Sequence, residues 1–208
     1  MLVFLLRHQL CTIGCMSDDF AKHFPLRQAR THEVCGAGAQ AFAFALAGQM
    51  RASVLWISED WQTAQINPVG FGVYLAPQNM LIAKVKDQVD GLASAEEALR
   101  SGAVSLVVIE LSKPLSLLAG RRLQLAAEAG KSTGLCIIPE GAGSNAAESR
   151  WRCEPVFDAG DSTLMRWEII KNKTGTLANW NLRWDAKTSR IIVVSKAAQR
   201  PGSARASG

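Results

Sequence analysis

The feature that most constrains the fold is a short apolar strand that runs into a glycine and then into an alanine-rich helix. Residues 31–35 form the expected strand, Gly36 follows, and residues 37–44 open the helix. This order matches the frame of a phosphate-binding loop, G-x-x-x-x-G-K-[ST], in which backbone N–H groups and a lysine hold phosphates. The frame predicts an α/β protein.

The residues inside this frame do not match its chemistry. Gly36 occupies the first glycine position, but Ala41 replaces the second glycine, Phe42 the lysine and Ala43 the hydroxyl residue. The lysine and the hydroxyl each make a charge-assisted contact worth about 1.5–3 kcal/mol to phosphate or magnesium. We therefore expect little or no ATPase activity, and neither a cofactor nor a metal. A lone glycine after a strand in an unrelated α/β protein is the alternative interpretation.

Strands and helices then alternate along the chain. The apolar run at residues 53–58 is typical of a strand buried on both faces, and residues 135–138 also indicate a buried strand. Residues 79–83 and 104–109 are two further expected strands. Two helices are expected between them, one starting at Asp87 or Asp90 and ending at Gly102, the other over residues 115–129. This alternation predicts a mostly parallel central sheet with helices on both faces.

The pattern changes after Gly141. Apolar and polar residues alternate in four segments separated by turn residues, at 150–154, 164–170, 179–184 and 190–194. This period of two is typical of antiparallel strands with one wetter face. The sequence thus predicts a mixed sheet, parallel first and antiparallel last.

Length and termini suggest one domain with loose ends. A chain of 208 residues can bury a substantial core. We expect a flexible segment over residues 1–23, a single domain over 24–195 and a disordered basic tail over 196–208. The apolar run at residues 1–6 is too short for a membrane span. Five cysteines without a C-x-x-C pair favour a reducing compartment. A cytoplasmic protein with no membrane contact is the simplest interpretation.

The charge is concentrated near the C-terminus. Residues 1–170 carry 15 Lys and Arg against 17 Asp and Glu, whereas residues 171–208 carry 8 against 1. This asymmetry is compatible with an anionic partner such as single-stranded DNA, or with a solubilising tail.

Two acidic residues follow expected strands, Glu59 after the second and Glu110 after the fourth. Ligands of open α/β sheets bind beyond the carboxyl ends of the strands, where Gly36 also falls. In a nucleotide hydrolase such carboxylates steer magnesium and activate water. Solvated strand ends or helix caps are the simpler interpretation of each.

Several of these segments resemble the RecA recombinases. Residues 100–110 resemble the strand that leads into their magnesium-binding acidic residue, with Glu110 at that position, and Glu59 matches their water-activating glutamate. Residues 170–173 resemble their V-K-N-K strand, which implies that Lys171 and Lys173 face the nucleotide of a neighbouring subunit. The resemblance extends over about residues 31–185. It departs at residues 41–43 and at residues 139–141, which replace a DNA-binding loop. The resemblance implies a RecA-like core with a degenerate nucleotide site.

A closer resemblance is to the ImuA family, also described as SulA-like. It rests on residues 32–36, 54–57, 121–129, 149–152 and 177–180. The resemblance implies an SOS-induced accessory of error-prone translesion DNA synthesis. Its implied partners are an ImuB-type polymerase-like protein and an error-prone replicative-type DNA polymerase, with RecA and single-stranded DNA as further candidates.

The sequence therefore favours a non-catalytic RecA-like adaptor. The expected interaction or DNA-contacting residues are Arg150, Trp151, Arg152, Lys171, Lys173 and Trp180, since aromatic and basic residues can stack bases or fill a partner's pocket. Packing within the sheet is the favoured interpretation of Trp167 and Trp184. The alternatives are a weak ATPase using Glu59 and Glu110, a single-stranded-DNA binder and, on the family label alone, a SulA-like cell-division inhibitor.

Overall fold

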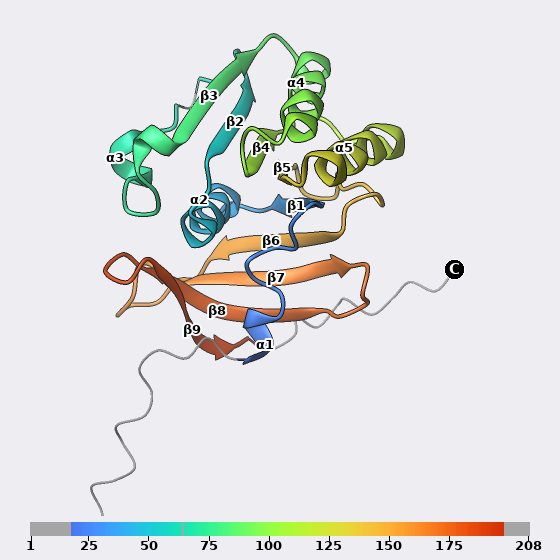
Figure 1. Cartoon of the computed structure of the whole chain (residues 1–208). Coiled ribbons are helices and arrows are strands. Elements are labelled where there is room, and N and C mark those ends of the chain that lie inside the picture. The colour runs from blue at the N-terminus through green and yellow to red at the C-terminus, as the bar shows by residue number, and fades with distance from the viewer. Residues whose placement is uncertain (1–17, 64, 198–208) are drawn as a thin grey trace, which may run out of the picture.

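The computed structural model describes residues 18–63 and 65–197, which build one nine-stranded sheet with helices on its faces (Figure 1). The strand order is β3-β2-β4-β5-β1-β6-β7-β8-β9. The strands are β1 Thr31–Cys35, β2 Val54–Glu59, β3 Met80–Val85, β4 Leu106–Glu110, β5 Thr133–Ile137, β6 Ser149–Pro155, β7 Met165–Asn172, β8 Ala178–Asp185 and β9 Arg190–Lys196.

The sheet has a parallel part and an antiparallel part that meet at β6. Strands β1 to β5 pair with one another in parallel, and β6 joins them in parallel to β1. On its other side β6 pairs antiparallel with β7, and β8 and β9 continue in the same way. The predicted mixed sheet, parallel first and antiparallel last, is confirmed.

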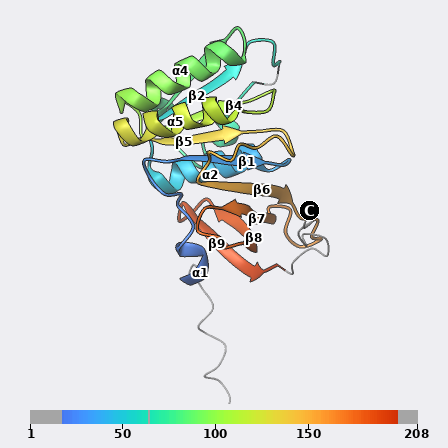
Figure 2. The same ribbon diagram turned by 90° about the vertical axis from the view of Figure 1, so that its right-hand side faces the viewer.

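The helices lie on both faces, as predicted (Figure 2). Helix α2 (Ala39–Met50) covers one face, and α4 (Gln88–Ser101) and α5 (Leu117–Gly130) cover the other. The short elements are α1 Asp18–Ala21, α3 Pro68–Phe71 and the 3-10 turn η1 Pro77–Asn79. Asp87 is the N-cap of α4, where its Oδ1 accepts from the N–H groups of Val89 and Asp90. Gly102 ends that helix in the left-handed region at φ 66°, which glycine adopts without strain.

Alternation along the strands divides the core into two. Val34, Trp56 and Val108 lie in the cluster under α2, while their neighbours Cys35, Ile57 and Ile109 lie in the cluster under α4 and α5. Successive side chains of a strand point to opposite faces, so a central parallel strand that is covered on both faces is apolar on both. This explains the continuous apolar runs of the sequence. The edge strand β3 differs, because Leu81 and Ile82 are exposed.

The predicted flexible segment over residues 1–23 is wrong for residues 18–23. Phe20 is fully buried, and its ring lies 5.1 Å from that of Trp180 and 5.4 Å from that of Phe24. Asp19 forms an ion pair of 2.7 Å with Lys196, which belongs to β9 and not to the predicted tail. The N-terminal segment therefore covers the antiparallel strands on the α2 face. The rest of both predicted loose ends, residues 1–17 and 198–208, lies outside the described residues.

Among the described residues, no helix has the length and apolarity that crossing a bilayer requires.

Candidate functional site

The Gly36 loop is a short turn closed against β6. Gly36 ends β1 at φ +93°, and a Cβ at this residue would clash with the carbonyl oxygen of Cys153. Two residues later Gly38 donates its N–H to the same oxygen at 2.8 Å. The close approach of the two backbones thus requires glycine at position 36 and leaves little room for a side chain at position 38. Helix α2 begins immediately afterwards at Ala39.

Three N–H groups of this loop are used within the protein. Besides the bond from Gly38, the Ala39 N–H donates to the Gly36 carbonyl at 3.0 Å, and the Phe42 N–H donates to the Gly38 carbonyl at 3.0 Å. A phosphate-binding loop needs such groups to point together at an anion. In this loop those of Gly38 and Ala39 point into the turn and at β6 instead.

The lysine and hydroxyl positions of the motif lie in the core. Phe42 is fully buried, with ring centroids at 4.5 Å from Trp167, 5.3 Å from Trp151 and 5.5 Å from Phe24. Ala43 is buried beside it. Position 42 therefore points away from the place where a nucleotide would lie, and its side chain holds together the aromatic cluster.

The two acidic residues lie at the carboxyl ends of β2 and β4, as predicted, but on different faces. Glu110 Oε1 accepts from the Trp56 indole N–H at 2.9 Å and from the Gln40 amide at 3.2 Å, on the α2 face. Glu59 is buried and, by strand alternation from Ile57, falls on the face of α4 and α5. The fold therefore does not aim the two carboxylates at one point. Clusters of three or more metal-ligating side chains are absent from the described residues.

Arg150 and Lys171 are not free cations, contrary to their prediction as interaction residues. They hold the crossover loop, residues 138–148, which connects β5 to β6. Arg150 Nε donates to buried Glu33 at 2.8 Å, and a second guanidinium nitrogen donates to the Ser144 carbonyl at 3.0 Å. Lys171 Nζ donates to the carbonyls of Ser144, Asn145 and Ala147 at 2.8–3.3 Å.

Glu33 completes this network from β1. Its Oε1 accepts from the Ser144 N–H at 2.7 Å, while Oε2 accepts from Arg150. The carboxylate is 1% exposed, so its charge is balanced inside the protein by the arginine. The network fastens the crossover loop to the sheet.

The other two predicted basic residues are more accessible. Arg152 lies 3.3 Å from Glu140 and 3.7 Å from Glu168, with 30% of its side chain exposed. Lys173 is 45% exposed and lies 3.7 Å from Glu148. The Nε atom of Arg152 is buried, whereas Lys173 pairs at the surface, where an ion pair contributes little to stability. Of the two, Lys173 is therefore the more available to a partner.

The prediction that Trp151 and Trp180 contact DNA or a partner is wrong. Both side chains are buried to within 1% on the α2 face, because β6 and β8 turn them toward α1 and α2. A buried indole can neither stack a base nor fill a partner's pocket. Trp167 is equally buried, and Trp184 packs on Tyr74 and donates to the Val73 carbonyl at 3.0 Å. These last two residues pack as predicted.

The described cysteines are buried free thiols. Burial raises the pKa of Cys35, Cys136 and Cys153. A thiol held protonated in this way is a poor nucleophile.

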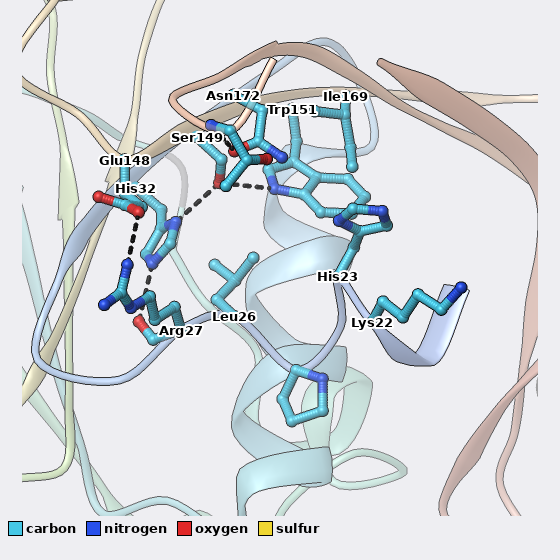
Figure 3. A pocket seen from close by; sticks show the side chains of 12 residues that line it. Lys22, His23, Leu26, Arg27, His32, Glu148, Ser149, Trp151, Ile169 and Asn172 are labelled. Carbon is cyan, nitrogen blue, oxygen red and sulfur yellow. Dashed lines mark hydrogen bonds and ion pairs between the residues drawn. The ribbon is translucent and has the colours of Figure 1, made fainter. Parts of the chain in front are cut away.

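A hollow at the amino ends of β1 and β6 contains a polar chain that sequence reasoning missed (Figure 3). The Trp151 indole N–H donates to Ser149 Oγ at 3.1 Å, and Ser149 Oγ lies 2.7 Å from His32 Nδ1. His32 Nε2 lies 2.9 Å from the Arg27 carbonyl, which can only accept, so Nε2 carries the proton and Nδ1 accepts from the serine. No spacing in the sequence connects positions 32 and 149, since only the β1–β6 pairing brings them together.

The histidine of this polar chain is a weak base. Burial lowers the pKa of His32 to about 4, with the hydrogen bond to Arg27 and the charge of Glu148 opposing the shift. An imidazole with so low a pKa is a weak proton acceptor at neutral pH. The chain instead fixes the segment around Arg27 to the sheet.

The sheet order, the Gly36 turn and the antiparallel extension define a RecA-like fold. The crystal structure of the RadB recombinase matches with a TM-score of 0.60 over 79% of this chain and 90% of that chain, at 11% identity. The structure of SulA from Pseudomonas aeruginosa matches at 25% identity over 52% of this chain and 97% of that chain, with a TM-score of 0.42. No protein-family model and no curated protein matches the sequence.

Proposed function

We propose that this protein is a non-catalytic RecA-like adaptor of the error-prone translesion DNA synthesis complex, related to the ImuA family. One observation carries the proposal: Phe42, at the position of the catalytic lysine, is fully buried among aromatic rings. A RecA-like domain that does not bind ATP would not use it to assemble filaments. It would keep its rigid surfaces, which an adaptor uses to bind partners. The resemblance to the ImuA family is the reason for proposing the translesion DNA synthesis complex as the place where the adaptor works.

The proposed partners are an ImuB-type polymerase-like protein, an error-prone replicative-type polymerase and RecA. Binding of the first is the direct test. The purified chain should co-elute with an ImuB-type protein in size-exclusion chromatography, with the same affinity whether or not ATP and magnesium are present. Absence of a complex between two folded proteins, or a complex that requires ATP, would contradict the proposal.

A further inference from the structure

Helix α5 carries the stretch 121–129, and most of that stretch has a folding role. Leu123, Ala126 and Ala127 are buried in the core. Gln124 Oε1 accepts from both the N–H and the hydroxyl of Thr31 at 3.0 Å, which ties α5 to the start of β1.

Two members of the stretch have no such role. Leu125 is 64% exposed, and Arg121 is exposed and makes no hydrogen bond or ion pair with the described residues. By contrast, Arg122 and Glu128 on the same helix pair with Glu96 and Arg30. An exposed leucine one helical turn from an arginine that makes no ion pair with the described residues is a combination common at protein–protein interfaces.

Both side chains line one groove. Together with Leu117, Ala146 of the crossover loop and Lys173, they surround a hollow of about 460 Å³ between α5 and that loop. The leucines and the alanine form an apolar floor, and the two cations stand beside it. No carboxylate lines the groove within the described part of the chain, although Lys173 Nζ lies 3.7 Å from Glu148 outside it.

The wall opposite α5 is held in place. Arg150, Glu33 and Lys171 fix the crossover loop through the network described above. Gly120 of α5 lies so close to Ser144 and Ala146 that a Cβ would clash with them, so helix and loop are in tight contact below the groove. A preformed site loses little entropy on binding.

We propose that this groove binds an extended or helical segment of a partner protein that carries leucine-like side chains flanked by carboxylates. The apolar side chains would cover Leu117 and Leu125, and the carboxylates would face Arg121 and Lys173. The chain's own ends do not fit this chemistry, since residues 1–17 and 198–208 contain no Asp or Glu. The inference rests on the proposed adaptor function and names the surface by which the adaptor binds.

The test measures affinity for the purified ImuB-type protein by isothermal titration calorimetry, with the full chain and four single variants. Leu125→Asp and Arg121→Glu should each weaken binding by about tenfold or more, because one removes the apolar contact and the other places like charges together. Lys173→Glu should also weaken binding. The matched control is Leu118→Asp, on the same helix and 72% exposed but outside the groove, which should bind within about twofold of wild type. Circular dichroism confirms that each variant is folded.

The outcomes separate the two proposals. If the wild type binds and the groove variants bind equally well, the groove is not the binding surface, while the proposed adaptor function stands. If the folded wild type does not bind, both fall. Sedimentation of the chain alone adds a third result: a dimer that Leu125→Asp dissociates, with partner binding unchanged, would assign the groove to a second copy and overturn the inference. Binding of a single-stranded oligonucleotide that only Leu125→Asp and Arg121→Glu abolish would overturn it in favour of nucleic acid.

Discussion

The Gly36 loop and the groove beside α5 differ in what their side chains and backbone groups are used for. In the loop, the Gly38 N–H is bound to β6 and Phe42 is packed in the core. In the groove, Arg121 and Leu125 contribute to neither packing nor ion pairing among the described residues. The groups of the Gly36 loop, where the motif would hold a ligand, therefore pack and hydrogen-bond within the protein. The exposed side chains that could bind a partner lie elsewhere, in the groove beside α5.

The largest expected effect comes from restoring the lysine of the loop. Phe42→Lys would place an unpaired ammonium among three aromatic rings. It should destabilise the protein by more than the loss of about 3–5 kcal/mol that is typical of Phe→Ala in a core. Urea unfolding measures the loss, with Phe42→Leu as the milder control. A variant with wild-type stability that binds ATP would show that the loop is not committed to folding.

Acid should reveal the role of His32. Its pKa is about 4 in the folded protein and 6.5 in the unfolded chain, so the unfolded chain takes up a proton first as the pH falls. The stabilisation is complete above pH 6.5 and is lost toward pH 4, by about 3 kcal/mol. His32→Gln keeps a donor and an acceptor but does not titrate.

Unfolding midpoints of wild type and His32→Gln at several pH values between 7.5 and 4 provide the measurement. The difference in stability between the two proteins should shrink or reverse as the pH falls. A constant difference would mean that the imidazole is not buried in its neutral form.

A smaller loss is expected when the charge is removed from the anchor of the crossover loop. Glu33→Gln weakens the charge-assisted bond from Arg150 and should cost about 1.5–3 kcal/mol. Because that loop forms one wall of the groove, partner binding should weaken as well. Thermal unfolding and calorimetry of the same variant test both effects. Unchanged stability would mean that the loop does not depend on this carboxylate.

The smallest effect is expected in the groove itself. Arg121→Ala should change the free energy of unfolding by no more than about 0.5 kcal/mol, since the side chain contacts solvent. Arg122→Ala, which breaks the ion pair with Glu96, should cost less than about 1 kcal/mol. A loss of several kcal/mol in Arg121→Ala would show that this arginine has a folding role after all.

The sequence predicted the arrangement of strands and helices well, for physical reasons that act locally. Apolar runs, the cap at Asp87 and the stop at Gly102 depend on near neighbours in the chain, and all appear in the structure. The parallel and antiparallel parts of the sheet were also predicted. The switch from continuous to alternating apolar residues marks the change from strands with two buried faces to strands with one.

The candidate site was predicted less well, since its residues are decided by contacts between distant segments. Trp151 and Trp180 are surface candidates by type, yet Phe20 and Phe24 cover them from a segment more than a hundred residues away. In the sequence Arg150 and Lys171 resemble free cations. In the structure both donate hydrogen bonds to carbonyl groups of the crossover loop. Only the folded chain shows which charges are already satisfied.

The contact between Gly38 and Cys153 also limits how this protein could change over generations. Opening the turn around a triphosphate would require breaking that backbone bond, removing Phe42 from the core and refilling the space it leaves. Each of these changes alone would lower the stability of the protein without yet creating nucleotide binding. If the protein is the non-catalytic adaptor proposed above, a variant that binds a triphosphate in this loop requires several simultaneous mutations, and selection acting one step at a time would preserve the present loop.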